Sequence, residues 1–173
     1  TIRLDIAFTK VSTVEIVKAK PNTITNSDNN SFCSLSNNIK NPRSGLAVGS
    51  NEKGNFYKAV ADNAASGLGK EVKIDLNKTP FINITWKIEK DLPGIKENTK
   101  KGHDFAARVF AVKKTGATPL SNRAINYVFS SNNHIGFNSP SPYTKKSIDN
   151  VLATTKENLN EWVNVNGKVL LIK

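Results

Sequence analysis

The sequence predicts an all-β, mainly antiparallel domain of the β-sandwich or jelly-roll type with at most one short helix. Three segments in which apolar and polar residues alternate carry this prediction, and turn-rich links separate them. In the clearest segment Ile82, Ile84, Trp86 and Ile88 share one face, and polar residues occupy the other. The three segments are residues 81–89, residues 103–112 with apolar residues on both faces, and residues 123–130. Strands joined in this way are typical of antiparallel meanders and sandwiches.

The first half of the chain is predicted to hold further strands around an Asn-rich loop. Residues 2–17 mix alternation with Thr and Val, which favours one or two strands. Residues 21–45 contain many Asn and Pro residues, which indicates a loop with at most a short strand at residues 31–35. Beyond this loop we expect a strand at 56–61, a tight connection of small residues at 63–69, a strand at 72–76 and a turn at 77–80.

The second half is predicted to end in one ambiguous segment and one hairpin. Polar, turn-rich stretches indicate connections at residues 91–101 and 131–143. Residues 145–159 fit a helix and a strand about equally, because Thr and Asn weaken the helical pattern. The Asn166-Gly167 pair predicts a two-residue turn in a hairpin at 163–172. No linker interrupts the pattern, so we expect a single domain over residues 1–173.

The chain is strongly basic, but its positive charge is dispersed. Its 25 basic and 14 acidic residues give a net charge of +11, and only 4 of the basic residues are Arg. The Lys residues are single or in pairs such as Lys100-Lys101 and Lys145-Lys146. Nucleic-acid-binding domains concentrate basic residues on one face or carry a recognisable motif, and neither is visible here. We therefore expect a solvated, Lys-rich surface and no nucleic-acid partner.

The Cys and His residues and the absence of Met limit which kinds of site and which processing we expect for this chain. The single Cys33 excludes an internal disulfide framework and a Cys-based zinc cage. His103 and His134 lie on separate segments without metal-ligand spacing, so we expect no metal, no cofactor and two ordinary loop histidines. The absence of Met predicts a processed precursor or a fragment, from which any signal peptide has already been removed. No segment is long and apolar enough to span a bilayer.

Six stretches follow one another in a distinctive order. They are Asn-Phe-Tyr-Lys-Ala-Val-Ala-Asp-Asn-Ala-Ala-Ser, Val-Lys-Ile-Asp-Leu with Thr-Pro and Trp-Lys-Ile, Leu-Pro-Gly, Asp-Phe-Ala-Ala-Arg-Val-Phe-Ala-Val, Ala-Ile-Asn-Tyr-Val-Phe-Ser-Ser and Ser-Pro-Tyr-Thr. In this order they resemble the bacterial family called domain of unknown function 3047, over about residues 54–163. The resemblance implies an exported β-sandwich, periplasmic or secreted with its signal peptide removed, that has no assigned activity. It supplies no catalytic residue.

The chain departs from this family in two respects. The family tends to carry an aromatic residue at the position of Ile84 and a Trp at the position of Phe129. Its members also continue past the region of Trp162 into further strand-forming sequence, whereas this chain stops at Lys173. The resemblance therefore implies a domain in which the last strands of the family are missing or altered.

Two groups of residues are candidates for a ligand site. Asp104, Arg108 and Tyr127 lie on neighbouring predicted strands with His103 and Trp86, and together they would line a polar and aromatic site. In the alternative interpretation Trp86 is core and Arg108 is paired with Asp75 or Glu89. The loop aromatics Phe137 and Tyr143 would form a platform on which a sugar stacks, or would anchor their loop.

Asp104 is the one candidate for a catalytic residue. Glycoside hydrolysis needs two carboxyl groups facing each other across a cleft. Asp104 with Asp75, Glu89 or Asp91 is the available pool, and no spacing selects a pair. Motifs for acyl transfer, nucleotide hydrolysis and dinucleotide binding are absent from the sequence.

Three functions remain open at this point. The first is a non-catalytic, exported β-sandwich that binds an envelope or extracellular component, such as a glycan, through its edge loops. The second is a polysaccharide hydrolase or lyase that uses Asp104 and another acid. The third is a structural or assembly subunit in which an unpaired edge strand, residues 2–17 or 163–172, joins another copy. The sequence leaves the oligomeric state open.

Overall fold

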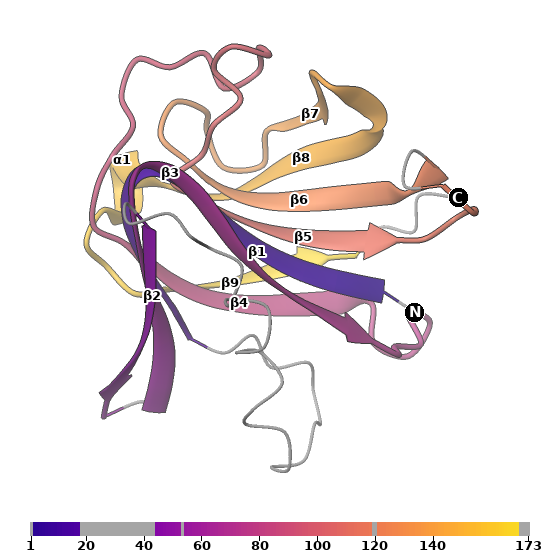
Figure 1. Ribbon diagram of the computed structural model, residues 1–173, viewed down its shortest axis with the longest axis horizontal. Coiled ribbons are helices and arrows are strands. Elements are labelled where there is room, and N and C mark those ends of the chain that lie inside the picture. Colours follow the sequence, from indigo (N-terminus) through magenta and orange to yellow (C-terminus); the bar gives the residue numbers. More distant parts are fainter. Residues whose placement is uncertain (1, 18–43, 53, 119–120, 170–173) are drawn as a thin grey trace.

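The described part of the chain is mostly β, as predicted, and contains one short helix. The computed structural model describes residues 2–17, 44–52, 54–118 and 121–169. The predicted loop at 21–45, apart from its last two residues, the short strand at 31–35 and Cys33 lie outside the described residues. In the described part of the chain the elements are β1 (Ile2–Val17), β2 (Ser44–Asn51), β3 (Gly54–Val72), β4 (Phe81–Ile88), β5 (Ala107–Lys113), β6 (Arg123–Ser130), β7 (Asn138–Ser141), β8 (Thr144–Thr154), α1 (Thr155–Asn158) and β9 (Val163–Lys168) (Figure 1).

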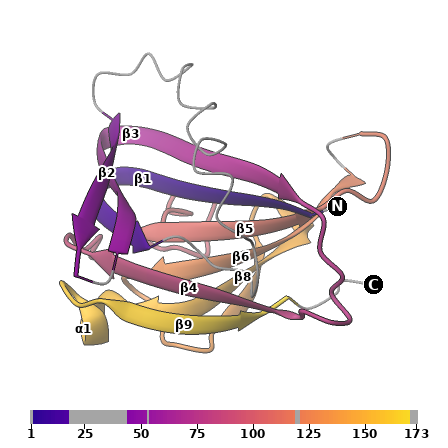
Figure 2. The same cartoon turned by 90° about the horizontal axis from the view of Figure 1, so that it is seen from below.

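The sheet bends back on itself because β1 changes neighbours along its length. The strand order is β2-β3-β1-β5-β6-β8-β7, and β4 and β9 lie off this path. The first part of β1 pairs with β5, from Ile2 to Ala7, and its last part pairs with β4, from Val14 to Val17. The β4–β9 pair is thereby carried across the face of β5 and β6 (Figure 2). Most pairs are antiparallel, but β6 and β8 run parallel.

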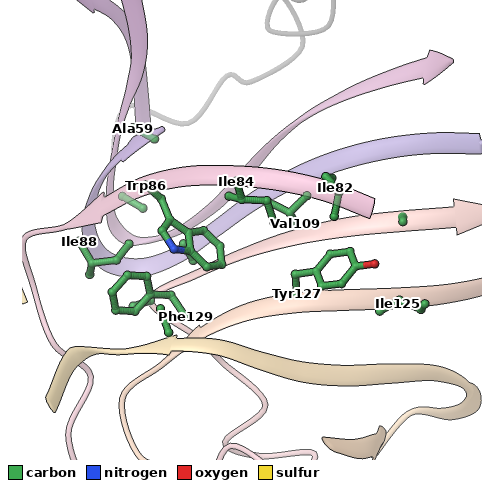
Figure 3. Close-up of a cluster of buried hydrophobic side chains, with 14 of the residues drawn as sticks. Ala59, Ile82, Ile84, Trp86, Ile88, Val109, Ile125, Tyr127 and Phe129 are labelled. Carbon is green, nitrogen blue, oxygen red and sulfur yellow. The ribbon is translucent and has the colours of Figure 1, made fainter. Parts of the chain in front are cut away.

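The main core fills the space between the β4–β9 pair and the strands β5 and β6. Alternate residues of β4 are buried, as the sequence predicts. Trp86 on β4 meets Phe129 on β6 edge to face, with ring centroids 5.3 Å apart (Figure 3). Ile84, Val109 and Tyr127 pack around this pair and are almost fully buried. Of the two interpretations of Trp86, the core position is the one that the structure shows.

A second, smaller core lies on the other side of β6. Phe105, Val128 and Val151 form it, and Phe137 packs against it. The segments before β5 and after β6 therefore cover the outer face of the sheet, and β6 is buried on both sides from Ile125 onward. This cover explains why both faces of the predicted strands carry apolar residues. It also encloses the polar side chains described below.

The structure corrects the predictions around β3. Residues 63–69 are not a tight connection, because β3 continues through them and pairs with β1 as far as Ile2, opposite Val72. The predicted strand at 72–76 is therefore wrong beyond Val72, where the described ladder ends. The turn at 77–80 is present, with the Lys78 N–H donating to the Asp75 carbonyl at 3.1 Å. Leu76 still packs against the main core.

Three later elements also differ from prediction. β5 starts at Ala107 and not at residue 103. The ambiguous segment resolves into strand β8 followed by the single turn of α1, so each alternative holds for part of it. β7 lies within the predicted loop at 131–143 and pairs with β8. Its partner is the adjacent strand in sequence, and its Pro140 explains why no strand pattern is visible there.

The predicted C-terminal hairpin is wrong. Asn166 and Gly167 lie inside β9, opposite Asn83 and Ile82 of β4. A Cβ atom at residue 167 would lie 2.6 Å from Cε1 of Tyr127, so glycine is needed here for packing and not for a turn. The N-terminal segment is not an edge either, because β1 has neighbours on both sides. In the described residues β9 pairs only with β4.

Candidate functional site

Arg108 occupies the outer face of β5. Strand alternation places Ala107 and Val109 in the main core and Arg108 on the opposite side. Its guanidinium carbon lies 4.8 Å from the ring centroid of Phe105 and 5.5 Å from that of Phe110. Among the described residues its one hydrogen bond runs from Nη2 to a backbone carbonyl oxygen, that of His103, at 3.1 Å.

Burial of the guanidinium lowers the pKa of Arg108 below its usual value. The negative charges of Asp149 and Asp104 act in the opposite direction and raise it. Even a lowered Arg pKa leaves the group charged at neutral pH. The site therefore holds a permanent cation that is only partly solvated and that uses few of its five donors.

A polar network lies beside Arg108. Parallel pairing of β6 and β8 sets Asn126 opposite Asp149. Asn126 Nδ2 donates to Asp149 Oδ1 at 2.6 Å and to Ser147 Oγ at 3.0 Å. Asp149 Oδ2 lies 2.7 Å from His103 Nε2, and because a carboxylate only accepts, the ring nitrogen donates. Asn126 Oδ1 is buried and has no hydrogen-bond partner among the described residues.

Tyr143 forms the rim of this region. It lies in the turn between β7 and β8, and 64% of its surface is exposed. Its hydroxyl donates to the Lys100 carbonyl oxygen at 2.8 Å, and its ring meets the His103 ring edge to face at 5.5 Å. The ring is therefore held in place at two points while most of it remains open to solvent.

These side chains line a shallow depression of about 380 Å³. Its described lining contains one guanidinium, one imidazole, an amide, hydroxyl groups and aromatic rings, and no carboxylate. The lining residues are His103, Arg108, Phe110, Asn126, Ser141, Tyr143, Thr144 and Ser147. A surface of this kind offers hydrogen-bond donors and a flat ring to a polar ligand.

The structure brings only part of the predicted site residues together. Arg108 and Tyr143 both line the depression, and Asp104 is buried close enough to influence the charge of Arg108. Tyr127 lies in the main core instead, where its hydroxyl donates to the Lys168 carbonyl oxygen at 2.9 Å and burial raises its pKa. Phe137 packs against the second core.

The predicted acid partners of Arg108 are wrong. Asp75 caps a turn by accepting from the Asn77 N–H at 3.0 Å, and Glu89 pairs with Lys58 at 3.2 Å. The fourth acid of the catalytic pool, Asp91, accepts from the Thr155 hydroxyl at 2.5 Å. Each of these acids thus has partners of its own, in a different part of the fold.

Sequence reasoning missed Asn126, Ser147 and Asp149. The only available signal was the alternation of Ser147, Asp149 and Val151, which a strand at this position would have placed on one face. His103 is a loop residue, as expected, but its side chain is only 4% exposed. No cluster of three or more potential metal ligands occurs in the described residues. The same residues include no helix that is long and apolar enough to cross a membrane.

The chain matches the model of a known protein family over most of its length. A family model described as "Protein of unknown function (DUF3047)" matches residues 36–170, which is more than half of the chain. This range includes every residue of the depression. No curated protein and no solved structure matches the sequence.

Proposed function

The chain belongs to the family of proteins of unknown function DUF3047, and from this premise we propose that it is a non-catalytic module that binds a glycan of the cell envelope or extracellular space. The binding site in this proposal is the depression between Arg108 and Tyr143. The observation that carries it is the Tyr143 ring, 64% exposed and fixed by its hydroxyl beside a partly buried guanidinium.

The chemistry of the lining supports a sugar ligand. A flat aromatic ring packs against the C–H groups of a sugar ring, while its polar edge stays hydrogen-bonded. Hydroxyl groups of the sugar need donors and acceptors, which Arg108, Ser147 and Thr144 supply at the depression. Because Tyr143 is already held by Lys100 and His103, little conformational entropy is lost when a ligand stacks on it.

The same lining argues for binding in preference to hydrolysis. A glycosidase of the usual type places two carboxyl groups about 5–10 Å apart across the sugar. The described lining has no carboxylate, and both oxygens of the nearby Asp149 accept hydrogen bonds, from His103 and Asn126. A polyol-binding surface is therefore a better match than an acid–base pair.

The test is a glycan array followed by titration calorimetry with whichever glycan binds. We expect Tyr143→Ala to weaken binding by about tenfold or more, which corresponds to at least 1.4 kcal/mol. Tyr143→Phe, which keeps the ring, should retain most of the affinity. Phe81→Ala is the matched control, because Phe81 is also an exposed aromatic (51%) but lines a different cavity. Flat isotherms across the array, or unchanged binding by Tyr143→Ala, would overturn the proposal.

A further inference from the structure

Two lysine pairs that are far apart in the sequence border the same depression. Lys100 and Lys101 precede His103, and Lys145 and Lys146 follow Tyr143 and Thr144. The hydrogen bond from the Tyr143 hydroxyl to the Lys100 carbonyl oxygen, 2.8 Å long, joins the two segments. All four lysines are exposed. Part of the dispersed positive charge of the sequence is thus concentrated on one rim.

One of these lysines lies directly beside the lining in the sequence. Lys145 follows Thr144 and precedes Ser147 by two residues, and both Thr144 and Ser147 line the depression. Arg108 belongs to the lining itself, so positive groups occur both in this surface and next to it.

The nearby negative charges do not belong to the described lining of this surface. Asp149 and Asp104 are both buried, at 3% and 9% exposure, and neither lines the depression. The two oxygens of Asp149 are occupied by His103 and Asn126. In the described lining a ligand therefore meets donors and a cation and no carboxylate.

From this arrangement we infer that the glycan is acidic, with carboxylate or sulfate groups held by Arg108 and Lys145 while a sugar ring stacks on Tyr143. The inference rests on the proposed glycan-binding function. A planar guanidinium binds carboxylate and sulfate oxygens in a two-point geometry. The exposed lysines add long-range attraction, which salt weakens. Neutral sugars would use Tyr143 but gain nothing from the rim.

The first experiment compares two forms of one ligand. An oligogalacturonate and its carboxyl methyl ester have the same sugar rings and differ in charge. Calorimetry with the wild-type protein should show the acidic form binding roughly tenfold to a hundredfold more tightly, the difference expected for hydrogen bonds to charged groups. Raising the ionic strength from about 0.05 M to about 0.5 M should reduce this difference.

The possible results separate the inference from the function on which it rests. Equal binding of the two forms overturns the inference and leaves glycan binding intact. No binding of these probes or of any glycan on the array overturns both. Equal or tighter binding of a single-stranded oligonucleotide of the same charge also overturns the inference, because the rim would then serve nucleic acid.

Variants test the same point from the protein side. Lys145→Gln should weaken binding of the acidic form severalfold and leave binding of the ester unchanged. Lys78→Gln is the matched control, since Lys78 is exposed but borders the other cavity. Arg108→Lys keeps the charge but loses the planar guanidinium. It should therefore also reduce the ratio of the affinity for the acidic form to the affinity for the ester, compared with wild type. Identical losses for Lys145→Gln and Lys78→Gln would contradict the inference.

Discussion

His103 Nε2 lies 2.7 Å from Asp149 Oδ2, and both side chains are 4% exposed. This contact joins the segment before β5 to β8, although β6 lies between the two strands in the sheet. Asn126 on β6 holds the other oxygen of the same carboxylate. One buried carboxylate therefore fixes three segments at the base of the depression.

Replacing that carboxylate should destabilise the fold. We expect Asp149→Asn to lower the free energy of unfolding by roughly 2–4 kcal/mol, because only one acceptor oxygen would remain and either His103 or Asn126 would face an NH₂ group in its place. Urea unfolding followed by circular dichroism measures the change. Glu157→Gln, at an exposed position on α1, is the control and should change the value by less than about 0.5 kcal/mol. Equal stability of the two variants would show that the network contributes little.

The predictable part of the fold is the part in which apolar residues of a strand meet a core. β4 was predicted to within one residue because its alternation follows the burial of each side chain. β6 was predicted with its observed bounds, although both of its faces are buried from Ile125 onward. The wrong predictions concern small residues whose role is set by a partner far away in the sequence. Gly167 is small because Tyr127 lies against it, and the small residues of β3 pair with β1.

The candidate site divides in the same way. Arg108 and Tyr143 could be chosen from the sequence because a charge in an apolar strand and an aromatic in a polar loop are both unusual. Asn126 and Asp149 could not, since only the parallel register of β6 and β8 places them side by side. The hydrogen bond between Tyr143 and Lys100 could not be predicted from the sequence either, because it joins residues 43 positions apart through a backbone carbonyl.

The contact between Gly167 and Tyr127 predicts a specific coupling. Gly167→Ala should cost about 1–3 kcal/mol of unfolding free energy, because the new methyl group would collide with a buried ring. In a Tyr127→Leu background the same change should cost less, and a double-mutant cycle in urea measures the difference. The exposed β9 position Asn164, changed to Ala, is the control. Additive effects would contradict the packing that keeps Asn166-Gly167 inside a strand.

Asp91 should contribute to the loss of stability in acid. Burial raises its pKa, but hydrogen bonds with Ser131, Thr155 and the Leu92 N–H, together with the charge of Lys156, lower the pKa below its usual value overall. A carboxyl group with a lowered folded-state pKa stabilises the fold above its unfolded pKa of about 3.9. This contribution is lost as the pH falls through the folded value.

The stability difference between wild type and Asp91→Asn should therefore be positive at neutral pH and shrink below about pH 4. Urea titrations at a series of pH values measure it. Thr155→Val removes one of the hydrogen bonds that lower the pKa, and it should weaken the pH dependence without abolishing it. Parallel curves for wild type and Asp91→Asn over the whole range would show that Asp91 has the same pKa in both states.

Glu97 should hold the segment between β6 and β7 in place. Its side chain is buried, and it accepts hydrogen bonds from the Ser130 hydroxyl, from the Ser131 N–H at 2.8 Å and from Asn133 Nδ2 at 2.6 Å. All three are donors, so both carboxylate oxygens are required as acceptors. In Glu97→Gln one oxygen becomes an NH₂ group that faces donors, and we expect a loss of roughly 2–3 kcal/mol.

The effect should also be local. Hydrogen exchange at the Ser131 amide should accelerate in Glu97→Gln more than exchange at β4 amides, because Ser131 loses its acceptor while the main core remains packed. Glu161→Gln, an exposed change before β9, should leave both rates unaltered. If the Ser131 amide exchanges at the wild-type rate in Glu97→Gln, the carboxylate is not what orders this segment, and its burial would have to be explained by packing alone.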